Sequence, residues 1–294
     1  MRRMLTVEFF DDPATFLSVA HDYLASDPVM VNVVSVYADR DATEGVAPAP
    51  YHWYAVVRDT TGGRVVGAAM RTAPFAPYPP YLAPMPVEGA VLLARLLHER
   101  GEHPGGGNGP LPASRAFAEE SARLWGGTVE VAMAQRMWEL GALLAPVGVA
   151  GAARVATRDD ERLCTEWYTD FPHAARAQAG NASGAHEMRP PTREEMLARI
   201  DGGRILLWEV DGTPVNLTGL AFPVLGVGRI APVYTPVEHR GHGYASACVA
   251  EASRRLRRLG RVCLATDVDN PVSNGVYAAL GYVAVAEMAN HTVR

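Results

Sequence analysis

The segment from residue 233 to residue 246 constrains the fold more than any other part of this chain. It reads Val-Tyr-Thr-Pro-Val-Glu-His-Arg-Gly-His-Gly-Tyr-Ala-Ser, and it joins an apolar strand to an amphipathic helix through a turn that contains Gly241 and Gly243. Glycine lets the backbone approach a ligand closely, and the first amide groups of a helix have no partner within it. This turn predicts a pyrophosphate site, although glycine pairs also occur in plain tight turns.

A nicotinamide dinucleotide is one ligand that such a segment can bind. The dinucleotide fingerprint places its first glycine directly after a buried strand and its third near the helix start. Here Glu238-His239-Arg240 separates the strand from the glycine, and Ser246 occupies the position of the third small residue. Asp267 follows at about the distance of a ribose-binding acid, but only one βαβ unit is visible. These departures argue against a nicotinamide enzyme.

A second patterned segment follows a predicted strand at 261–267. From residue 270 to residue 282 it reads Asn-Pro-Val-Ser-Asn-Gly-Val-Tyr-Ala-Ala-Leu-Gly-Tyr. Asn270 is a good N-cap, Pro271 suits the first helical position, and Gly281 suits the position after the helix end. The segment therefore predicts a short helix, which carries Tyr277.

Together, the two segments resemble motifs A and B of the GCN5-related N-acetyltransferases. Motif A has Arg or Gln, two residues, Gly, one residue, and then Gly or Ala, as in Arg240-Gly241-His242-Gly243-Tyr244-Ala245. The Asn, Ser, Tyr and Gly-aromatic positions of motif B match the segment at 270–282. The resemblance covers residues 204–288 directly, extends over 151–294, and reaches 1–150 only through an internal repeat.

The resemblance implies that two neighbouring strands separate to admit the thioester and pantetheine of acetyl-CoA. Asn270 and Ser273 would contact the pantetheine, and Tyr277 would protonate the departing thiolate as general acid, unless it is a core tyrosine with a satisfied hydroxyl. The backbone of Val233, Tyr234 and Thr235 would hold the pantetheine, and the pyrophosphate would bind to Arg240, Gly241, His242, Gly243, Tyr244, Ala245 and Ser246.

The sequence offers two candidates for the general base. The family often uses a glutamate or histidine on the strand before motif A, and residues 228–235 contain neither. Glu209 is one candidate, and a water molecule relayed through backbone carbonyls is another. His239 and His242 lie three residues apart without a carboxylate or cysteine partner, so we expect no metal.

A weak internal repeat predicts two domains of the same fold. A strand at 5–9 with a following helix has a counterpart at 153–157, and a hairpin and an Ala-Pro element follow in each half. Small residues at 146–151 mark the boundary. We therefore predict an α/β chain with a degenerate domain at 1–148 and an acetyltransferase domain at 149–294, each a mixed twisted sheet flanked by helices. Residues 101–112 and 172–191 are predicted to be irregular, and the second stretch ends at Thr192-Arg193-Glu194-Glu195, a capping-box helix start.

The N-terminal half lacks the features of a cofactor site. Pro86 removes an amide donor before its central helix, and Glu88 places a carboxylate where an anion would need positive potential. Its late helix, predicted at 113–125, has Phe117 and no tyrosine. We therefore expect one acetyl-CoA per chain, with the N-terminal half as support and as a candidate wall of the acceptor pocket.

Composition excludes several function classes. All 27 basic residues are arginine, which rules out a Walker lysine, a Schiff-base lysine and a Ser-Lys dyad. The net charge of -5 argues against nucleic-acid binding, because domains that bind nucleic acids are normally basic. The chain shows no signal peptide and no long apolar span, so we expect a cytoplasmic protein without membrane contact. Its three cysteines, Cys164, Cys248 and Cys263, are widely spaced and indicate buried thiols.

The sequence thus predicts direct transfer of the acetyl group of acetyl-CoA to a primary amine of a small molecule or peptide. The alternative is a non-catalytic acyl-CoA-binding sensor or regulatory module, which needs the same pyrophosphate turn. Structural pairing of two domains without a ligand is disfavoured by the glycine turn, and Tyr277 favours the enzyme. Neither the acceptor nor the oligomeric state follows from the sequence.

Overall fold

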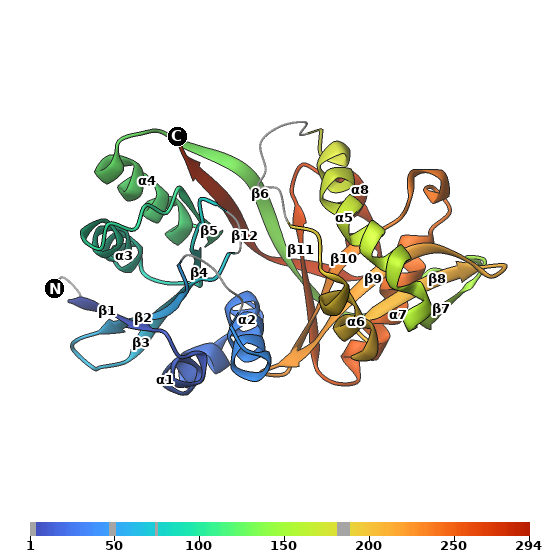
Figure 1. Cartoon of the computed structure of the whole chain (residues 1–294), viewed down its shortest axis with the longest axis horizontal. Coiled ribbons are helices and arrows are strands. Elements are labelled where there is room, and N and C mark those ends of the chain that lie inside the picture. Colours follow the sequence, from blue (N-terminus) through green and yellow to red (C-terminus); the bar gives the residue numbers. More distant parts are fainter. Residues whose placement is uncertain (1–3, 47–50, 74–75, 181–188) are drawn as a thin grey trace. The chain divides into compact units, whose positions relative to one another are not determined.

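The computed structural model describes residues 4–46, 51–73, 76–180 and 189–294. The chain is mixed α/β and forms two compact units, whose elements are labelled in Figure 1. Unit 1 contains the described residues up to Arg136 together with Ala286–Arg294, and unit 2 contains the described residues from Met137 to Val285. The predicted fold class is confirmed.

Unit 1 has a mixed sheet in the strand order β1-β2-β3-β4-β5-β12. Helices α3 and α4 pack on one face through Leu93, Leu97 and Phe117, and α1 lies on the other face, where Phe16 stacks on Tyr54. The bounds are β1 (Leu5–Phe10), α1 (Pro13–Ser26), α2 (Asn32–Glu44), β2 (Trp53–Asp59), β3 (Val65–Arg71), β4 (Tyr81–Leu82), α3 (Val87–Glu99), β5 (Gly106–Pro110), α4 (Ala113–Trp125) and β12 (Tyr282–Val293).

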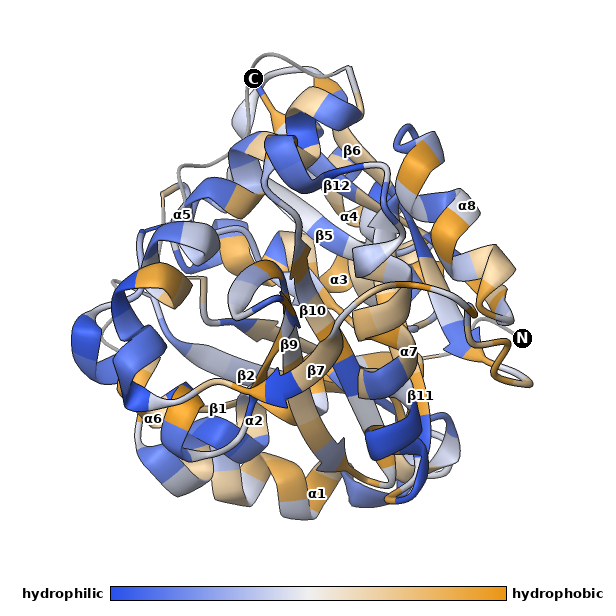
Figure 2. Ribbon diagram, turned by 90° about the vertical axis from the view of Figure 1, so that its right-hand side faces the viewer, coloured by the Kyte–Doolittle hydropathy of each residue, from blue (hydrophilic) through white to orange (hydrophobic). Residues whose placement is uncertain are grey.

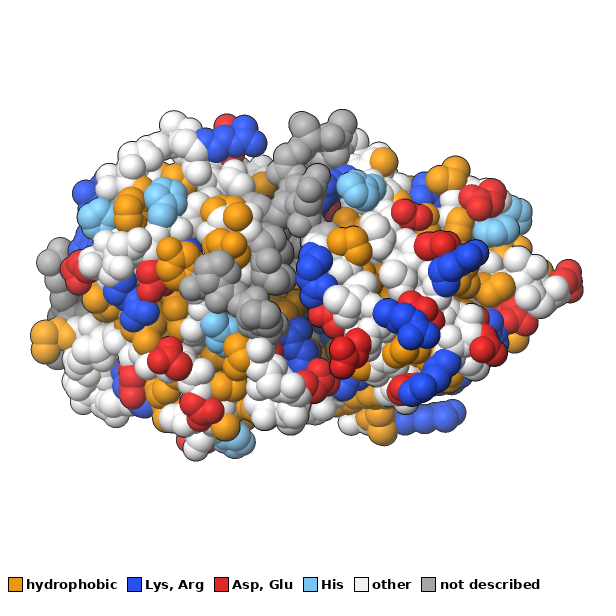
Figure 3. Space-filling view, in the orientation of Figure 1, with side chains coloured by type: hydrophobic (Ala, Val, Ile, Leu, Met, Phe, Trp, Pro, Cys, Tyr) orange, Lys and Arg blue, Asp and Glu red, His pale blue; other side chains and the backbone are white. Residues whose placement is uncertain are grey.

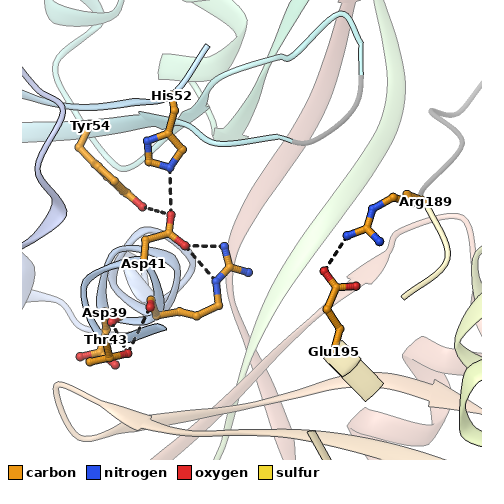
Figure 4. Close-up of polar contacts among 8 residues, drawn as sticks. Asp39, Asp41, Thr43, His52, Tyr54, Arg189 and Glu195 are labelled. Carbon is orange, nitrogen blue, oxygen red and sulfur yellow. Dashed lines mark hydrogen bonds and ion pairs between the residues drawn. The ribbon is translucent and has the colours of Figure 1, made fainter. Parts of the chain in front are cut away.

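A buried carboxylate ties α2 to β2 in unit 1. Asp41 is 3% exposed, and its Oδ2 accepts a hydrogen bond from the Tyr54 hydroxyl at 2.7 Å and lies 3.0 Å from Nε2 of His52 (Figure 4). Its Oδ1 accepts from the guanidinium of Arg40 at 2.7 and 3.0 Å. Both oxygens are satisfied, as a buried carboxylate requires, so this cluster reads as a structural network.

Unit 2 has a mixed sheet in the strand order β6-β11-β10-β9-β8-β7. Helices α5 and α6 pack on one face around Trp167, Met196 and Leu217, and α7 and α8 pack on the other around Ile230 and Leu256. Figure 2 shows hydrophobic and hydrophilic residues alternating along α5 and α6. The bounds are β6 (Val129–Leu140), β7 (Ala152–Val155), η1 (Arg158–Asp160), α5 (Glu161–Gln178), α6 (Arg193–Asp201), β8 (Ile205–Val210), β9 (Thr213–Val224), β10 (Val227–Tyr234), η2 (Val237–His239), α7 (Tyr244–Arg257), β11 (Arg261–Asp267) and α8 (Pro271–Ala279).

The start of α6 has the predicted capping box. The amide of Glu195 donates to the Thr192 hydroxyl at 3.2 Å, and the Glu195 carboxylate accepts from the Thr192 amide at 2.7 Å. Arg189 adds an ion pair of 2.6 Å to the same carboxylate, as Figure 4 shows. The cap lies within four residues of chain, which is why the sequence alone could predict it.

The internal repeat extends to an irregularity in strand pairing. In unit 2, Ile230 of β10 faces Leu220 of β9, and Val233 then faces Thr218, so three steps on β10 match two steps on β9. Such a bulge bends the strand at the Ala-Pro element.

Unit 1 repeats the same pattern. Leu82 of β4 faces Ala69 of β3. Three residues after Leu82, Met85 lies beside Gly67, since a Cβ added to Gly67 would come within 2.4 Å of the Met85 Cβ. The spacing of three residues against two is thus similar in both units, and an Ala-Pro pair lies within it in each.

Unit 1 is formed by two separate stretches of the chain. In unit 1, β5 pairs antiparallel with the end of β12, from Met288 opposite Pro110 to Thr292 opposite Gly106. In unit 2, the end of β6 contributes Trp138, whose indole donates to the Thr266 hydroxyl at 2.8 Å. The boundary predicted at residue 148 lies between β6 and β7 and stays a prediction.

The irregular stretch predicted at 101–112 is wrong in its second half, because residues 106–110 form strand β5. The neighbouring backbone lies so close that only glycine fits: a Cβ on Gly106 would come within 2.0 Å of the His291 carbonyl oxygen, and one on Gly109 within 2.2 Å of that of Leu82. Glycines that suggest a loop locally are required here by the adjacent strands.

The irregular stretch predicted from residue 172 also begins later. Helix α5 continues through Pro172 to Gln178, because Tyr168 and Phe171 before the proline and Ala174 after it pack against the core and stabilise the helix. Residues 181–188 of this predicted stretch lie outside the described residues.

Charged side chains of both signs lie on the surface of unit 2, and the three cysteines are buried. In Figure 3, acidic and arginine side chains alternate over the visible face of unit 2. Cys164, Cys248 and Cys263 are buried and free, as predicted. Among the described residues, no helix combines the length and apolar character that crossing a membrane requires.

Candidate acetyl-CoA site

The parallel pairing of β10 with β11 stops halfway along β10. It runs from Val227 opposite Arg261 to Arg229 opposite Cys263, and the rest of both strands lies beyond the last paired residues. Backbone groups of residues 230–234 are therefore not used in pairing with β11. The separation agrees with the gap that the resemblance implied for a pantetheine arm.

Helix α7 begins at the open end of this gap and presents a row of amides. Within the part of the chain that the structure describes, none of the six backbone N–H groups from Gly241 to Ser246 donates to another protein group. The first one inside the helical pattern is that of Ala247, which donates to the Gly243 carbonyl at 3.0 Å. Unpaired amides at the positive end of a helix are suited to bind an anion.

The two glycines of the turn are required by backbone conformation. Gly241 has φ +82° and Gly243 has φ +79°, in the left-handed region that β-branched residues avoid. An added Cβ on Gly241 would meet no atom within 4 Å, and one on Gly243 would lie 3.3 Å from Val149. Val149 precedes β7, so the segment before β7 borders the turn, which the sequence did not suggest.

Arg240 supports the turn from within. Its Nε donates to the carbonyl oxygen of Thr235 at 3.1 Å, which connects the end of β10 to the turn. His242 is exposed and stacks on Tyr244, with ring centroids 5.3 Å apart. The turn therefore has an internal hydrogen bond and an aromatic pair beside its free amides.

Asn216 on β9 anchors the end of β10 and was missed at the sequence level. Its buried side-chain amide donates to the carbonyl oxygen of Tyr234 at 2.8 Å and to the hydroxyl of Thr235 at 3.0 Å, and its Oδ1 accepts from Thr218 at 3.0 Å. Asn216 and Thr218 are polar residues at alternate positions of the mostly apolar strand β9. This pattern was the signal in the sequence that could have predicted the network. The Tyr234 ring packs against Trp167, 5.8 Å between centroids, so its backbone alone faces the gap region.

Helix α8 starts as predicted, at the far side of the gap. Asn270 is 3% exposed and caps the helix, since its Oδ1 accepts from the Ser273 amide at 3.0 Å. Its Nδ2 donates to Gln178 of α5 at 3.3 Å. The Asn270 carboxamide is thus used by the protein itself, while Ser273 is partly exposed.

Tyr277 lies on α8 in the core beside α7 and is 9% exposed. Its ring meets Tyr282 edge-on at 5.9 Å, and the Tyr282 hydroxyl is bonded to Ser253 at 2.7 Å. Among the described residues, the Tyr277 hydroxyl has no hydrogen-bond partner. Burial raises the pKa of Tyr277 well above its usual range, so this hydroxyl keeps its proton at neutral pH.

Glu209, the base candidate on β8, is paired with an arginine. Its carboxylate accepts from Nε of Arg154, whose other nitrogens form a bidentate pair with Asp160 at 2.7 and 2.8 Å. The Glu209 carboxylate is therefore engaged in a contact within the protein. Within the described residues, no group of three or more His, Cys, Asp or Glu side chains has an arrangement that could hold a metal ion.

Comparisons with known proteins agree with this geometry. The acetyltransferase (GNAT) family model matches residues 161–282. No curated protein sequence matches the chain. Among solved structures, a GCN5-related N-acetyltransferase from Sphaerobacter thermophilus has a TM-score of 0.60 at 16% identity, over 98% of this chain and 95% of that chain.

Two further structures cover the whole chain. A tandem GNAT protein from the clavulanic acid biosynthesis pathway has a TM-score of 0.54 at 15% identity, over 98% of both chains. A Drosophila protein has a TM-score of 0.67 at 11% identity, over 100% of this chain and 99% of that chain. Likeness at such identities shows a shared fold.

The matched segment contains every site residue predicted from the sequence. It runs from the first residue of α5 to the first residue of β12, and it includes the glycine turn and Tyr277. The family model does not extend to the N-terminal half, which shares the fold through the tandem neighbour. Over residues 161–282, this chain matches the acetyltransferase (GNAT) family.

Proposed function

We propose that the protein transfers the acetyl group of acetyl-CoA to a primary amine of a small molecule or peptide, at a single site in unit 2. One observation carries this proposal. The six unpaired amides from Gly241 to Ser246 lie at the end of β10, where its pairing with β11 has already stopped. A diphosphate and an extended amide-bearing arm need this combination of free amides and unpaired strand edge.

The residues of this chain would divide the binding between them. The amides of the turn would hold the pyrophosphate. The pantetheine would use those backbone groups of Val233 to Thr235 that the protein leaves unpaired, since the carbonyl oxygens of Tyr234 and Thr235 already accept from Asn216 and Arg240. Ser273, at the start of α8, would contact the same arm from the other side. Acetyl-CoA supplies the activated acetyl group, so no nucleophilic side chain is needed.

Tyr277 is the proposed general acid. Its hydroxyl has no protein partner among the described residues, and its raised pKa keeps it protonated at neutral pH. It would donate this proton to sulfur as the C–S bond breaks and negative charge develops on the departing thiolate. A backbone amide at the end of β10 would stabilise the negative charge that develops on the acetyl oxygen.

Unit 1 is proposed to bind no acetyl-CoA. Helix α3 begins after Pro86, which donates no amide hydrogen, and carries Glu88 in its first turn. At the bulge that corresponds to Pro232 of unit 2, the carbonyl oxygen of Pro84 already accepts from the hydroxyl of Tyr23. The polar group that a pantetheine would use is therefore occupied by the protein.

The test is release of free thiol from acetyl-CoA by the full-length protein with a panel of amines, aminoglycosides and peptides. We expect amine-dependent thiol release with at least one of them. Calorimetric binding of acetyl-CoA without turnover on any acceptor would favour the alternative, a non-catalytic acyl-CoA sensor. Absence of both binding and turnover would contradict the proposal.

A further inference from the structure

Amide formation also needs a group that takes a proton from the acceptor nitrogen. Strand β10 contains no acidic residue and no histidine, and Glu209 is held by Arg154. The remaining wall of the gap is β11, which ends at Asp267. This inference rests on the proposed function and concerns the same site.

Asp267 and Tyr277 lie on opposite faces of the sheet. Side chains alternate along a strand, and on β11 Val262 and Leu264 face the core under α7 and α8. Thr266 faces the same side, since its hydroxyl donates to Asn274 of α8 at 2.7 Å. Asp267 therefore faces the side that α5 covers, beyond Cys263, the last residue paired with β10.

Asp267 also differs from the other carboxylates of unit 2 in its partners. Every other partly buried carboxylate among the described residues of this unit has an arginine partner. These are Glu139, Asp160, Glu161, Glu209 and Glu251. Within the described residues Asp267 has no arginine partner, and its side chain takes part in one hydrogen bond there, in which Oδ1 accepts from the amide of Asp269 at 2.9 Å. No described residue donates to its Oδ2, in a unit where arginine pairs with the comparable carboxylates.

The electrostatics of Asp267 suit a proton acceptor. Burial raises the pKa of Asp267. The hydrogen bond from the Asp269 amide lowers it by a smaller amount, and the charge of Asp269 raises it again. Within the described residues, no arginine or histidine of α5, β10 or α8 forms an ion pair with it. A carboxylate with these surroundings binds a proton more readily than an exposed or ion-paired one.

We propose that Asp267 is the general base, which accepts a proton from the acceptor ammonium on the α5 side of the gap. Tyr277 protonates the departing sulfur from the other side of the sheet. One ammonium proton passes to Oδ2 of Asp267 and later to solvent. The nitrogen lone pair forms the bond to the acetyl carbon, and the C–S electron pair leaves on sulfur. Sulfur takes the Tyr277 proton, and the second proton lost by nitrogen restores that hydroxyl through solvent.

Asp267→Asn tests this assignment, with Asp269→Asn as the matched control. Asparagine keeps the bond to the Asp269 amide and the size of the side chain, so the turn should remain intact. We expect turnover of the best acceptor at pH 7 to fall about 100-fold in Asp267→Asn, within the range of general base catalysis, and less than about 3-fold in the control. Acetyl-CoA affinity, measured by calorimetry, should stay unchanged in both.

The pH profile separates a base from a structural residue. Without the carboxylate, the acceptor must arrive as the neutral amine, so kcat/KM of Asp267→Asn should rise about tenfold per pH unit up to the pKa of the amine. The wild-type value should fall only at low pH, where Asp267 itself becomes protonated. The two profiles should therefore converge at high pH, and Asp267→Glu should recover part of the rate.

Two results would overturn the assignment and leave the proposed function intact. One is a wild-type rate in Asp267→Asn, and the other is a loss of equal size at every pH. If the wild-type protein itself releases no thiol with any amine, the proposed function fails, and the general base assignment fails with it.

Discussion

The side-chain amide of Asn216 donates to the carbonyl oxygen of Tyr234 at 2.8 Å, inside the sheet of unit 2. Asn216 is fully buried, and Thr218 next to it on the same face is also fully buried and bonds its Oδ1. The contact holds the end of β10 at the point where β11 no longer pairs with it. A buried hydrogen bond therefore replaces the missing strand neighbour.

Replacing Asn216 with Ala should both destabilise the protein and weaken cofactor binding. The Tyr234 carbonyl and the Thr218 hydroxyl would lose their partner in a buried site, which costs about 1–3 kcal/mol in unfolding free energy. Urea denaturation measures this loss, and calorimetry measures acetyl-CoA affinity. Thr218→Val is the control, since it removes one bond and leaves the Tyr234 contact. Unchanged stability and affinity in Asn216→Ala would contradict this role.

Gly243→Val should abolish acetyl-CoA binding. A β-branched residue opposes φ +79°, and its side chain would cover amides of the turn. Gly226→Val is the control, because Gly226 has φ +73° and an open Cβ position at the other end of β10. Both variants should lose similar stability, and only Gly243→Val should lose binding. If folded Gly243→Val binds acetyl-CoA with unchanged affinity, the glycine turn is not part of the acetyl-CoA site.

Tyr277→Phe should lower turnover and leave acetyl-CoA affinity nearly unchanged. The hydroxyl acts when charge develops on sulfur, and its loss should reduce kcat about 100-fold or more. Tyr282→Phe is the control, since it removes a buried hydroxyl bonded to Ser253 and should change stability with little effect on kcat. Full turnover of Tyr277→Phe at all pH values would make Tyr277 a packing residue.

Titration of the full-length protein with acetyl-CoA should give one site per chain. The same titration of Gly243→Val should show no remaining site, because no glycine turn precedes α3 of unit 1 and the Pro84 carbonyl is occupied. The intact chain is needed, since unit 1 takes Ala286–Arg294 from the C-terminus. Two equivalent sites would show that unit 1 also binds the cofactor.

Asp160 should contribute stability that disappears in acid. Arg154 beside it lowers the pKa of Asp160 from its usual 3.8 to about 2. Because the folded pKa is depressed, the contribution is complete above pH 4 and is lost as the pH falls toward 2, and the shift corresponds to about 2 kcal/mol. Asp160→Asn should therefore be less stable than wild type in urea at pH 6, with a smaller difference at pH 2.5. An equal difference at both values would exclude this ion pair as its cause.

Features that depend on a few neighbouring residues could be predicted from the sequence. The cap of α8 at Asn270, the capping box at Thr192 and Glu195, and the left-handed turn at Gly241 and Gly243 each form within about four residues. Their physics is local, because caps and turns satisfy the backbone of the same short segment. The family resemblance rested on these segments and was confirmed.

Features that depend on distant neighbours needed the tertiary structure. Gly106 and Gly109 are strand residues because other backbones lie against them, and β12 completes the sheet of unit 1 from the far end of the chain. The roles argued for Asn216 and Asp267 likewise follow from which groups lie nearby and which do not. The sequence determined how short segments close on themselves, and the tertiary structure decided which buried polar groups have partners, because partners are set by contacts between distant residues.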